Sequence, residues 1–119
     1  MPRAPEPATS EPSDALPLHP HDFRILMALV GGPSYGTEIV RGIEAVERSE
    51  KLYPANLFRR IRDLLQRGLL EESPAPEGAD PRRTYVRLTR RGAQVARAEA
   101  RRLQELVREA AARDLLPGG

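Results

Sequence analysis

The chain has 119 residues, no cysteine and no tryptophan, and its formal net charge at pH 7 is only +2. This length suits one domain with a modest core, and the lack of cysteine excludes disulfide scaffolds, thiolate metal sites and cysteine nucleophiles. No apolar run approaches the roughly 20 residues that span a bilayer, and the N-terminus lacks the pattern of a secretory signal. We therefore expect a cytoplasmic protein, mainly helical, with no membrane partner.

The first 20 residues hold six of the twelve prolines, interspersed with Ala, Glu and Ser. Such a segment has little apolar surface to bury and few free amides. We expect a disordered tail over residues 1–20.

Two amphipathic helices are predicted next. The first begins at about His21, with Asp22 as a candidate N-cap, and ends at "GGP". Its core-facing residues are predicted to be Phe23, Leu26, Met27 and Val30. The second follows "GPSYG", and its apolar stripe is Ile39, Val40, Ile43 and Val46.

A third helix and a hairpin follow. The helix begins at Pro54, because proline suits the first turn, and ends at Gly68. Its apolar arc is Leu57, Phe58, Ile61, Leu64 and Leu65. "LLEES" and "TYVRL" are short strands joined by the exposed loop "PAPEGADPRR". Alternation along the second strand predicts that Thr84, Val86 and Leu88 face inward.

The last predicted helix runs from Arg90 to about Leu115, with Thr89 as its N-cap. It would be about 39 Å long, which is too long for so small a domain to cover. Its apolar stripe therefore predicts a partner helix from a second copy, although a helix folded back on its own domain is the alternative. The predicted dimerisation residues are Ala96, Ala100, Leu103, Leu106, Val107 and Ala110.

The order of three helices, a ribbon and a long helix predicts a mainly α (α+β) fold. Residues 21–89 would form a winged helix-turn-helix domain that binds DNA, and residues 90–116 would form a C-terminal dimerisation helix.

Two cationic elements indicate that double-stranded DNA is the partner. Asn56, Arg59 and Arg60 lie near the start of the third helix, where helix-turn-helix proteins contact base edges with such side chains. The hairpin loop adds Arg82 and Arg83. The complete set of DNA-binding candidates is Ser34, Tyr35, Pro54, Asn56, Arg59, Arg60, Arg82, Arg83 and Tyr85. The alternative is that these arginines form an ordinary solvated surface.

Asp63 and Arg67 share the polar arc of the third helix with Asn56, Arg59 and Arg60. A carboxylate repels phosphate unless it accepts from a cytosine or pairs with a neighbour. We expect Asp63 to form an intrahelical salt bridge with Arg59 or Arg67, each four residues away.

Catalysis is not expected. The two histidines, His19 and His21, stand beside Asp22, but a third ligand at suitable spacing is not apparent, so a linker meeting a helix cap is favoured over a metal site. The sequence contains no Ser-His-Asp or phosphate-loop pattern. We expect no metal, no cofactor and no enzymatic activity.

Three blocks, "LVGGPSYGTEIVRGI", "LYPANLFRRIRDLLQRGLLEE" and "RRTYVRLTRRG", resemble the signature blocks of the PadR-like transcriptional regulators in order and spacing. The resemblance covers residues 21 to about 110. The residues that carry it are Gly32, Pro33, Gly36, Glu38, Ile39, Leu57, Ile61, Leu64, Gly68, Leu69, Arg83, Tyr85, Leu88, Thr89 and Gly92. In the third helix, Ala55, Asn56 and Phe58 stand where the family usually has glycine, threonine and tyrosine.

The resemblance implies a winged-helix homodimer that regulates transcription, mostly as a repressor, and the single C-terminal helix resembles the short subfamily. Together with the cationic elements it predicts binding to a palindromic operator, and response to a small-molecule effector is a further hypothesis. The alternative function is a winged-helix module that binds protein without specific DNA binding, because a fold does not determine its partner.

Overall fold

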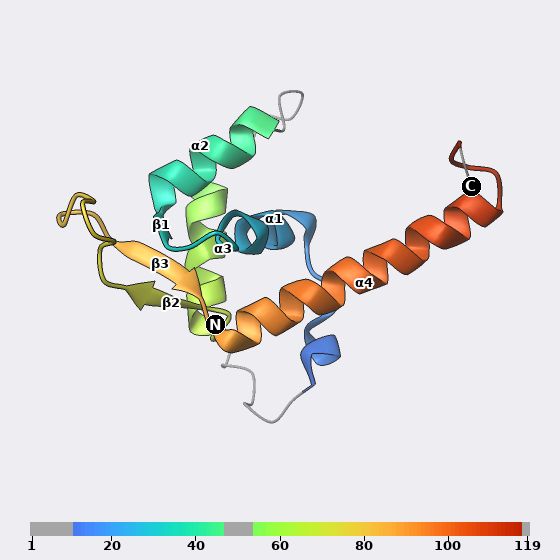
Figure 1. Ribbon diagram of the computed structural model, residues 1–119, viewed down its shortest axis with the longest axis horizontal. Coiled ribbons are helices and arrows are strands. Elements are labelled where there is room, and N and C mark those ends of the chain that lie inside the picture. Colours follow the sequence, from blue (N-terminus) through green and yellow to red (C-terminus); the bar gives the residue numbers. More distant parts are fainter. Residues whose placement is uncertain (1–10, 47–53, 118–119) are drawn as a thin grey trace.

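The computed structural model describes residues 11–46 and 54–117, apart from the side chains of residues 54 and 55. Its elements, in chain order, are the short 3₁₀ helix η1 (Pro12–Ala15), α1 (Pro20–Ala28), β1 (Ser34–Tyr35), α2 (Gly36–Val46), α3 (Pro54–Gln66), β2 (Leu70–Ser73), β3 (Tyr85–Leu88) and α4 (Arg90–Ala112) (Figure 1). Residues 1–10 of the predicted tail lie outside the described residues.

The sheet has the order β1-β3-β2, and both pairings are antiparallel. Helices α1, α2 and α3 gather beside it, and α4 runs from the base of the β2–β3 hairpin past the rest of the molecule as a rod (Figure 1). This arrangement confirms the predicted winged helix-turn-helix fold with a long C-terminal helix. α4 ends three residues before the predicted Leu115.

The core lies where α1, α3 and the first turns of α4 meet the base of the hairpin. Its most completely buried apolar side chains are Ile25, Leu26, Leu57, Leu64, Leu69, Leu70 and Val95. Apolar side chains therefore hold the helical unit, the hairpin and α4 together as one body.

The buried face of α1 is rotated relative to the prediction. Leu26 is buried as predicted, but Met27 and Val30 are 46% and 69% exposed, and Ile25 and Leu29 take their places in the core. Phe23 is only partly buried. Two apolar stripes lie side by side on this short helix, so the 3.6-residue period could not decide which stripe faces inward.

Two further predicted core residues are exposed, Val46 at 70% and Phe58 at 39%. Val46 is the last residue of α2 and extends beyond the packed part of that helix. Phe58 packs on the outside, against Gly36.

The second half of the predicted tail is packed, so the prediction of disorder over residues 1–20 is wrong for residues 11–20. Ala15 and Leu18 are only 9% and 6% exposed and belong to the core cluster. The Leu18 amide donates to Glu99 Oε2 of α4 at 2.8 Å, and Arg102 also donates to Glu99. The prediction failed because its two apolar anchors stand between prolines, and their partner lies 81 residues away in the chain.

In β3 the predicted alternation of faces also fails. Tyr85 and Val86 are adjacent yet only 5% and 4% exposed, whereas Thr84 precedes the strand and is exposed. β1 explains the difference, because its Tyr35 pairs directly with Tyr85 and covers the face that a two-stranded ribbon would leave open.

Thr89 joins the end of α3, the hairpin and α4. Its hydroxyl donates to Gly68 O at 2.7 Å and accepts from Gly92 N at 2.9 Å, which confirms the predicted N-cap. Its amide donates to Leu69 O at 3.1 Å. Gly68, two residues after the end of α3, has φ 77°, a left-handed conformation that favours glycine.

Gly92→Ala should reduce the free energy of unfolding by about 1–3 kcal/mol, because a Cβ there would lie 2.0 Å from the Leu69 carbonyl oxygen. Gly42→Ala is the matched control, since a Cβ within α2 meets nothing within 4 Å and should stabilise the helix by roughly 0.5–1 kcal/mol. Urea unfolding of both variants measures the difference. Equal stabilities would show that α4 does not approach the hairpin this closely.

Candidate nucleic-acid interface

The N-terminal half of α3 presents polar side chains to solvent. Asn56 and Arg59 are exposed, and with Arg60 and Asp63 they line a hollow of about 420 Å³. Because amide and guanidinium groups can each make paired hydrogen bonds to a base edge, this surface has the chemistry of a DNA reader.

Arg60 is tied back to α1. Its Nη1 donates to Asp22 Oδ1 at 3.2 Å, and Asp22 is only 7% exposed. Asp22 therefore pairs with α3 and is not the N-cap of α1, which is His19, whose Nδ1 accepts from the His21 amide. Burial and the nearby charge of Arg60 lower the pKa of His19.

The polar arc of α3 is also rotated relative to the prediction. Arg67 is 4% exposed, and its Nη1 lies 4.0 Å from Asp63 Oδ2, so the predicted intrahelical pair of Asp63 forms on that side. Arg62 and Gln66 are exposed and join Arg59 on the outer face.

In the hairpin loop, Asp80 organises Arg82. Asp80 Oδ1 accepts from the Arg82 amide at 2.9 Å and from its Nε at 3.1 Å, and Oδ2 accepts from Nη2 at 3.2 Å. Arg82 nevertheless remains 88% exposed. Arg82 and Asp80 are therefore a neutralising pair at the tip of the wing.

Arg83 lies over an aromatic ring. Its Cζ is 4.2 Å from the centroid of Tyr35, and its Nε is 3.9 Å from Asp80 Oδ2. Tyr85 meets Tyr35 edge to face at 5.7 Å. Tyr85 is only 5% exposed and packs against Tyr35, and this burial contradicts its prediction as a DNA contact.

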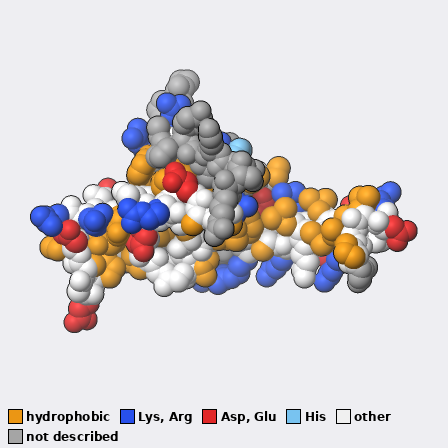
Figure 2. Space-filling view, turned by 90° about the horizontal axis from the view of Figure 1, so that it is seen from above, with side chains coloured by type: hydrophobic (Ala, Val, Ile, Leu, Met, Phe, Trp, Pro, Cys, Tyr) orange, Lys and Arg blue, Asp and Glu red, His pale blue; other side chains and the backbone are white. Residues whose placement is uncertain are grey.

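The remaining candidate residues, and Arg87 of the hairpin, have local structural roles. Ser34 Oγ donates to Glu38 Oε2 at 2.8 Å, and Pro54 is the first residue of α3. Arg87 Nε donates to Glu71 Oε2 across the hairpin at 2.8 Å. Figure 2 shows basic side chains at the hairpin end of the molecule, interspersed with acidic ones.

α4 has an inner and an outer half. Ala96 is 8% exposed and belongs to the core of its own domain, so it is not available for dimerisation as predicted. Farther along, Leu106 and Val107 are 48% and 54% exposed, and apolar side chains are visible at the far end of the helix (Figure 2). The predicted stripe is therefore buried in its own domain in the inner half of α4 and exposed in the outer half.

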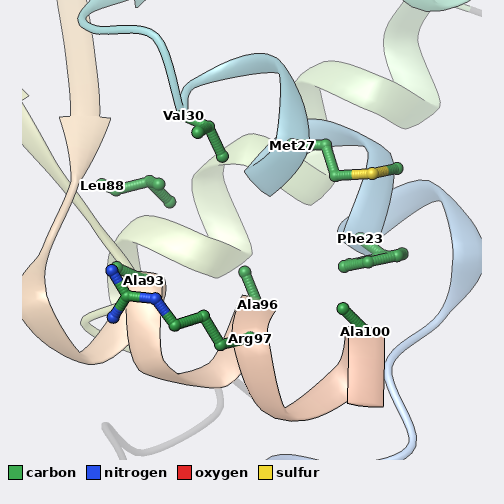
Figure 3. A pocket seen from close by; sticks show the side chains of 8 residues that line it. All are labelled: Phe23, Met27, Val30, Leu88, Ala93, Ala96, Arg97 and Ala100. Carbon is green, nitrogen blue, oxygen red and sulfur yellow. The ribbon is translucent and has the colours of Figure 1, made fainter. Parts of the chain in front are cut away.

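A groove lies between α1 and the inner half of α4. Phe23 and Met27 of α1 line it on one side and Ala96 and Ala100 of α4 on the other, and the groove has a volume of about 340 Å³ (Figure 3). The full lining is Phe23, Met27, Val30, Leu88, Ala93, Ala96, Arg97 and Ala100. The residues of α1 that the core leaves open are thus walls of an apolar groove.

Residues 25–98 match the pattern of the transcriptional regulator PadR-like family. The chain belongs to this family. The matched region includes the last four residues of α1, all of α2, α3 and the wing, and the inner part of α4. It includes Asn56, Arg59 and Arg83, whereas the segment before residue 25 and the outer half of α4 lie beyond it.

Solved structures give the same fold. A PadR family regulator from Clostridium difficile is 22% identical with a TM-score of 0.65, and the match covers 77% of this chain and 95% of that one. A transcriptional regulator from Clostridium thermocellum is 24% identical with a TM-score of 0.62, covering 78% and 87%. RosR of H. salinarum is 26% identical with a TM-score of 0.56, covering 83% and 98%. No curated protein sequence gives a significant match.

As a PadR-like protein the chain is a DNA-binding transcription regulator, and members of this family are not enzymes. Across residues 11–46 and 54–117 no three histidine, aspartate or glutamate side chains come together as metal ligands. Within the same ranges no helix is both long and apolar enough to cross a membrane.

Sequence reasoning missed Arg62 and the pairings of Asp22 and Asp80 with arginines. Arg62 could have been found by centring the helical wheel of α3 on Leu57, Ile61 and Leu64 alone, which places Arg62 opposite the core. The pairing of Asp80 with Arg82 had a local signal, because an aspartate bonding two residues ahead is common in turns. Asp22 pairs across 38 residues, for which the sequence has no signal.

The hydrogen bonds from the side chain and the amide of Arg82 hold the pKa of Asp80 below its ordinary value of 3.8. Since the folded pKa is lowered, the pairing is present at neutral pH and is lost as the pH falls through the lowered pKa. Arg82→Ala should return the pKa toward 3.8, as measured by carboxyl NMR titration. Arg83→Ala is the control and should raise it less, because Arg83 acts only through its charge. An unchanged pKa in Arg82→Ala would contradict the assigned pairing.

Proposed function

We propose that this PadR-like regulator is a repressor that binds a palindromic operator as a homodimer, with α3 in the major groove and the wing on the flanking backbone. The observation that carries the proposal is the exposure of Asn56 and Arg59 at the start of α3, on the same molecule as a cationic wing. In a helix-turn-helix, residues at the start of the second helix, here α3, contact base edges. Basic side chains around that helix contact phosphates.

The roles of the arginines differ in this proposal. Arg59 and Asn56 contact bases, because both side chains are exposed and neither makes a hydrogen bond or an ion pair with another residue in the described part of the chain. Arg60 donates to Asp22, so it contributes positive potential and fixes α3 against α1. Arg83 meets a phosphate, and Arg82 does so in competition with Asp80.

The outer half of α4 supports the homodimer. Leu106 and Val107 lie beyond the body of their own subunit, and the groove between α1 and α4 offers an apolar surface to a second copy. α4 has 23 residues and is roughly 34 Å long, so it can reach across a two-fold axis and still hold its own winged domain. Two recognition helices about 34 Å apart would meet successive major grooves.

Repression follows from steric exclusion in this proposal. A dimer over two half-sites occupies about two turns of duplex and blocks other proteins there. A small-molecule effector would act only by binding one arrangement of the subunits better than another, and the 340 Å³ groove is large enough to hold one.

Selection of bound sequences from a random duplex pool, followed by binding at several salt concentrations, tests the function. We expect one palindromic sequence to be enriched and its affinity to fall steeply with salt. If no duplex is preferred above non-specific binding at moderate salt, the protein is instead a winged-helix module for protein partners.

Arg59→Ala should cost about 1–3 kcal/mol of binding free energy on the selected operator and little on random duplex, because base contacts specify sequence. Arg83→Ala should weaken both similarly and lower the salt slope by about one, because phosphate contacts carry no sequence information. Arg101→Ala, on the exposed face of α4, is the matched control. Fluorescence anisotropy on both duplexes measures the changes. Equal losses on the two duplexes for Arg59→Ala would assign Arg59 to the backbone.

Leu106→Glu should convert the dimer to a monomer at micromolar concentration, because it places a charge in an apolar interface. Gln104→Glu adds the same charge on an exposed position of the same helix and should leave the dimer intact. Sedimentation equilibrium of the two variants and the unaltered chain measures the association. A dimer that survives Leu106→Glu would exclude this part of α4 from the interface.

A further inference from the structure

Tyr35 is placed between two side chains of the wing. One face of its ring carries the Arg83 guanidinium at 4.2 Å, and Tyr85 meets the ring edge to face at an interplanar angle of 84°. Tyr35 and Tyr85 are also direct partners in the β1–β3 pairing, so the backbone fixes the position of the ring. The backbone pairing therefore fixes the ring on which the Arg83 guanidinium stacks.

The segment that carries Tyr35 also contacts α3. Gly36 follows Tyr35 in the chain and lies under Phe58 of α3, so closely that a Cβ on Gly36 would be 2.5 Å from Phe58 Cε1. The wing arginine and α3 thus contact consecutive residues of one short segment. The β1–β3 pairing and the contact of Gly36 with Phe58 therefore link the position of Arg83 to that of α3.

Arg83 has a second neighbour that would hold it differently. Asp80 lies 3.9 Å from Arg83 Nε, but its oxygens already accept hydrogen bonds from Arg82. Arg83 is 46% exposed, so its guanidinium rests on the ring and keeps open positions toward solvent. Without the ring, the flexible arginine would lose its fixed position or move toward the carboxylate.

We propose that Tyr35 is a positioning residue for DNA binding, which holds Arg83 at a set place relative to α3 so that it meets a phosphate when α3 enters the major groove. This inference rests on the proposed function. Stacking limits the rotamers of Arg83 before DNA arrives, so less conformational freedom is lost on binding. The proposal assigns Tyr35 no contact with DNA, in contrast to its role as a candidate contact from the sequence.

A double-mutant cycle with Tyr35→Leu and Arg83→Ala tests the proposal, with Tyr35→Phe as the conservative variant. Tyr35→Leu should lower the affinity for operator and random duplex by about two- to fivefold and reduce the salt slope. Tyr35→Phe keeps the ring and should bind as the unaltered chain does. In the Arg83→Ala background, Tyr35→Leu should cause no further loss, because its effect acts through Arg83.

NMR of the DNA-free protein tests the stack separately. The side-chain protons of Arg83 should show a ring-current shift that persists in Tyr35→Phe and disappears in Tyr35→Leu. Circular dichroism and thermal unfolding show whether each variant is folded, and Tyr35→Phe keeps the test valid if Tyr35→Leu is not. A missing ring-current shift, or equal losses from Tyr35→Leu with and without Arg83, would overturn the inference while leaving the proposed function intact. An unaltered chain that prefers no duplex would overturn the proposed function itself.

Discussion

The contact between the first turn of α4 and the base of the hairpin is the constraint on which the rest of the structure depends. Thr89 bonds to Gly68 and Leu69 on one side and caps α4 through Gly92 on the other. The end of the recognition helix, the wing and the long helix therefore meet within a few residues. Because Gly92 has no side chain, α4 can lie directly on the Leu69 carbonyl, and any rotation of α4 would act on the wing and on α3 together.

The charges of the interface are arranged by pairing, and this matters more than the net charge of +2. Asp22 pairs with Arg60, Asp80 with Arg82, and Glu71 with Arg87. Arg59 and Arg62 of α3 are exposed and form no ion pair with any residue that the structure describes. A paired arginine must exchange its carboxylate for a phosphate, so it adds less to affinity than an open one. Under the proposed function, the paired arginines orient neighbouring elements and the open ones are left to contact DNA.

α4 connects two kinds of packing. Its inner half is buried against α1, β3 and the segment before α1, where Glu99 is only 1% exposed and accepts from the Leu18 amide and from Arg102. A buried carboxylate is tolerable only with such partners, so residues 11–18 are an integral part of the domain even though they precede the family match. The outer half has no such neighbours within the described residues, and its apolar side chains remain available to a second copy.

The sequence by itself determined the four helices, the two strands of the hairpin, their order and the family, because helix period, capping residues, proline and glycine act locally. It did not indicate η1 or β1. Thr89 as a cap, Gly68 as a terminator and the blocks shared with PadR-like regulators could all be read directly. Which stripe of α1 faces inward, and the burial of Tyr85 and Leu18, could not be read, because each depends on a partner far along the chain. The tertiary structure also decided which arginines are held by carboxylates and placed Arg83 on Tyr35, because Coulomb attraction and stacking depend on distance in space and not on separation in sequence.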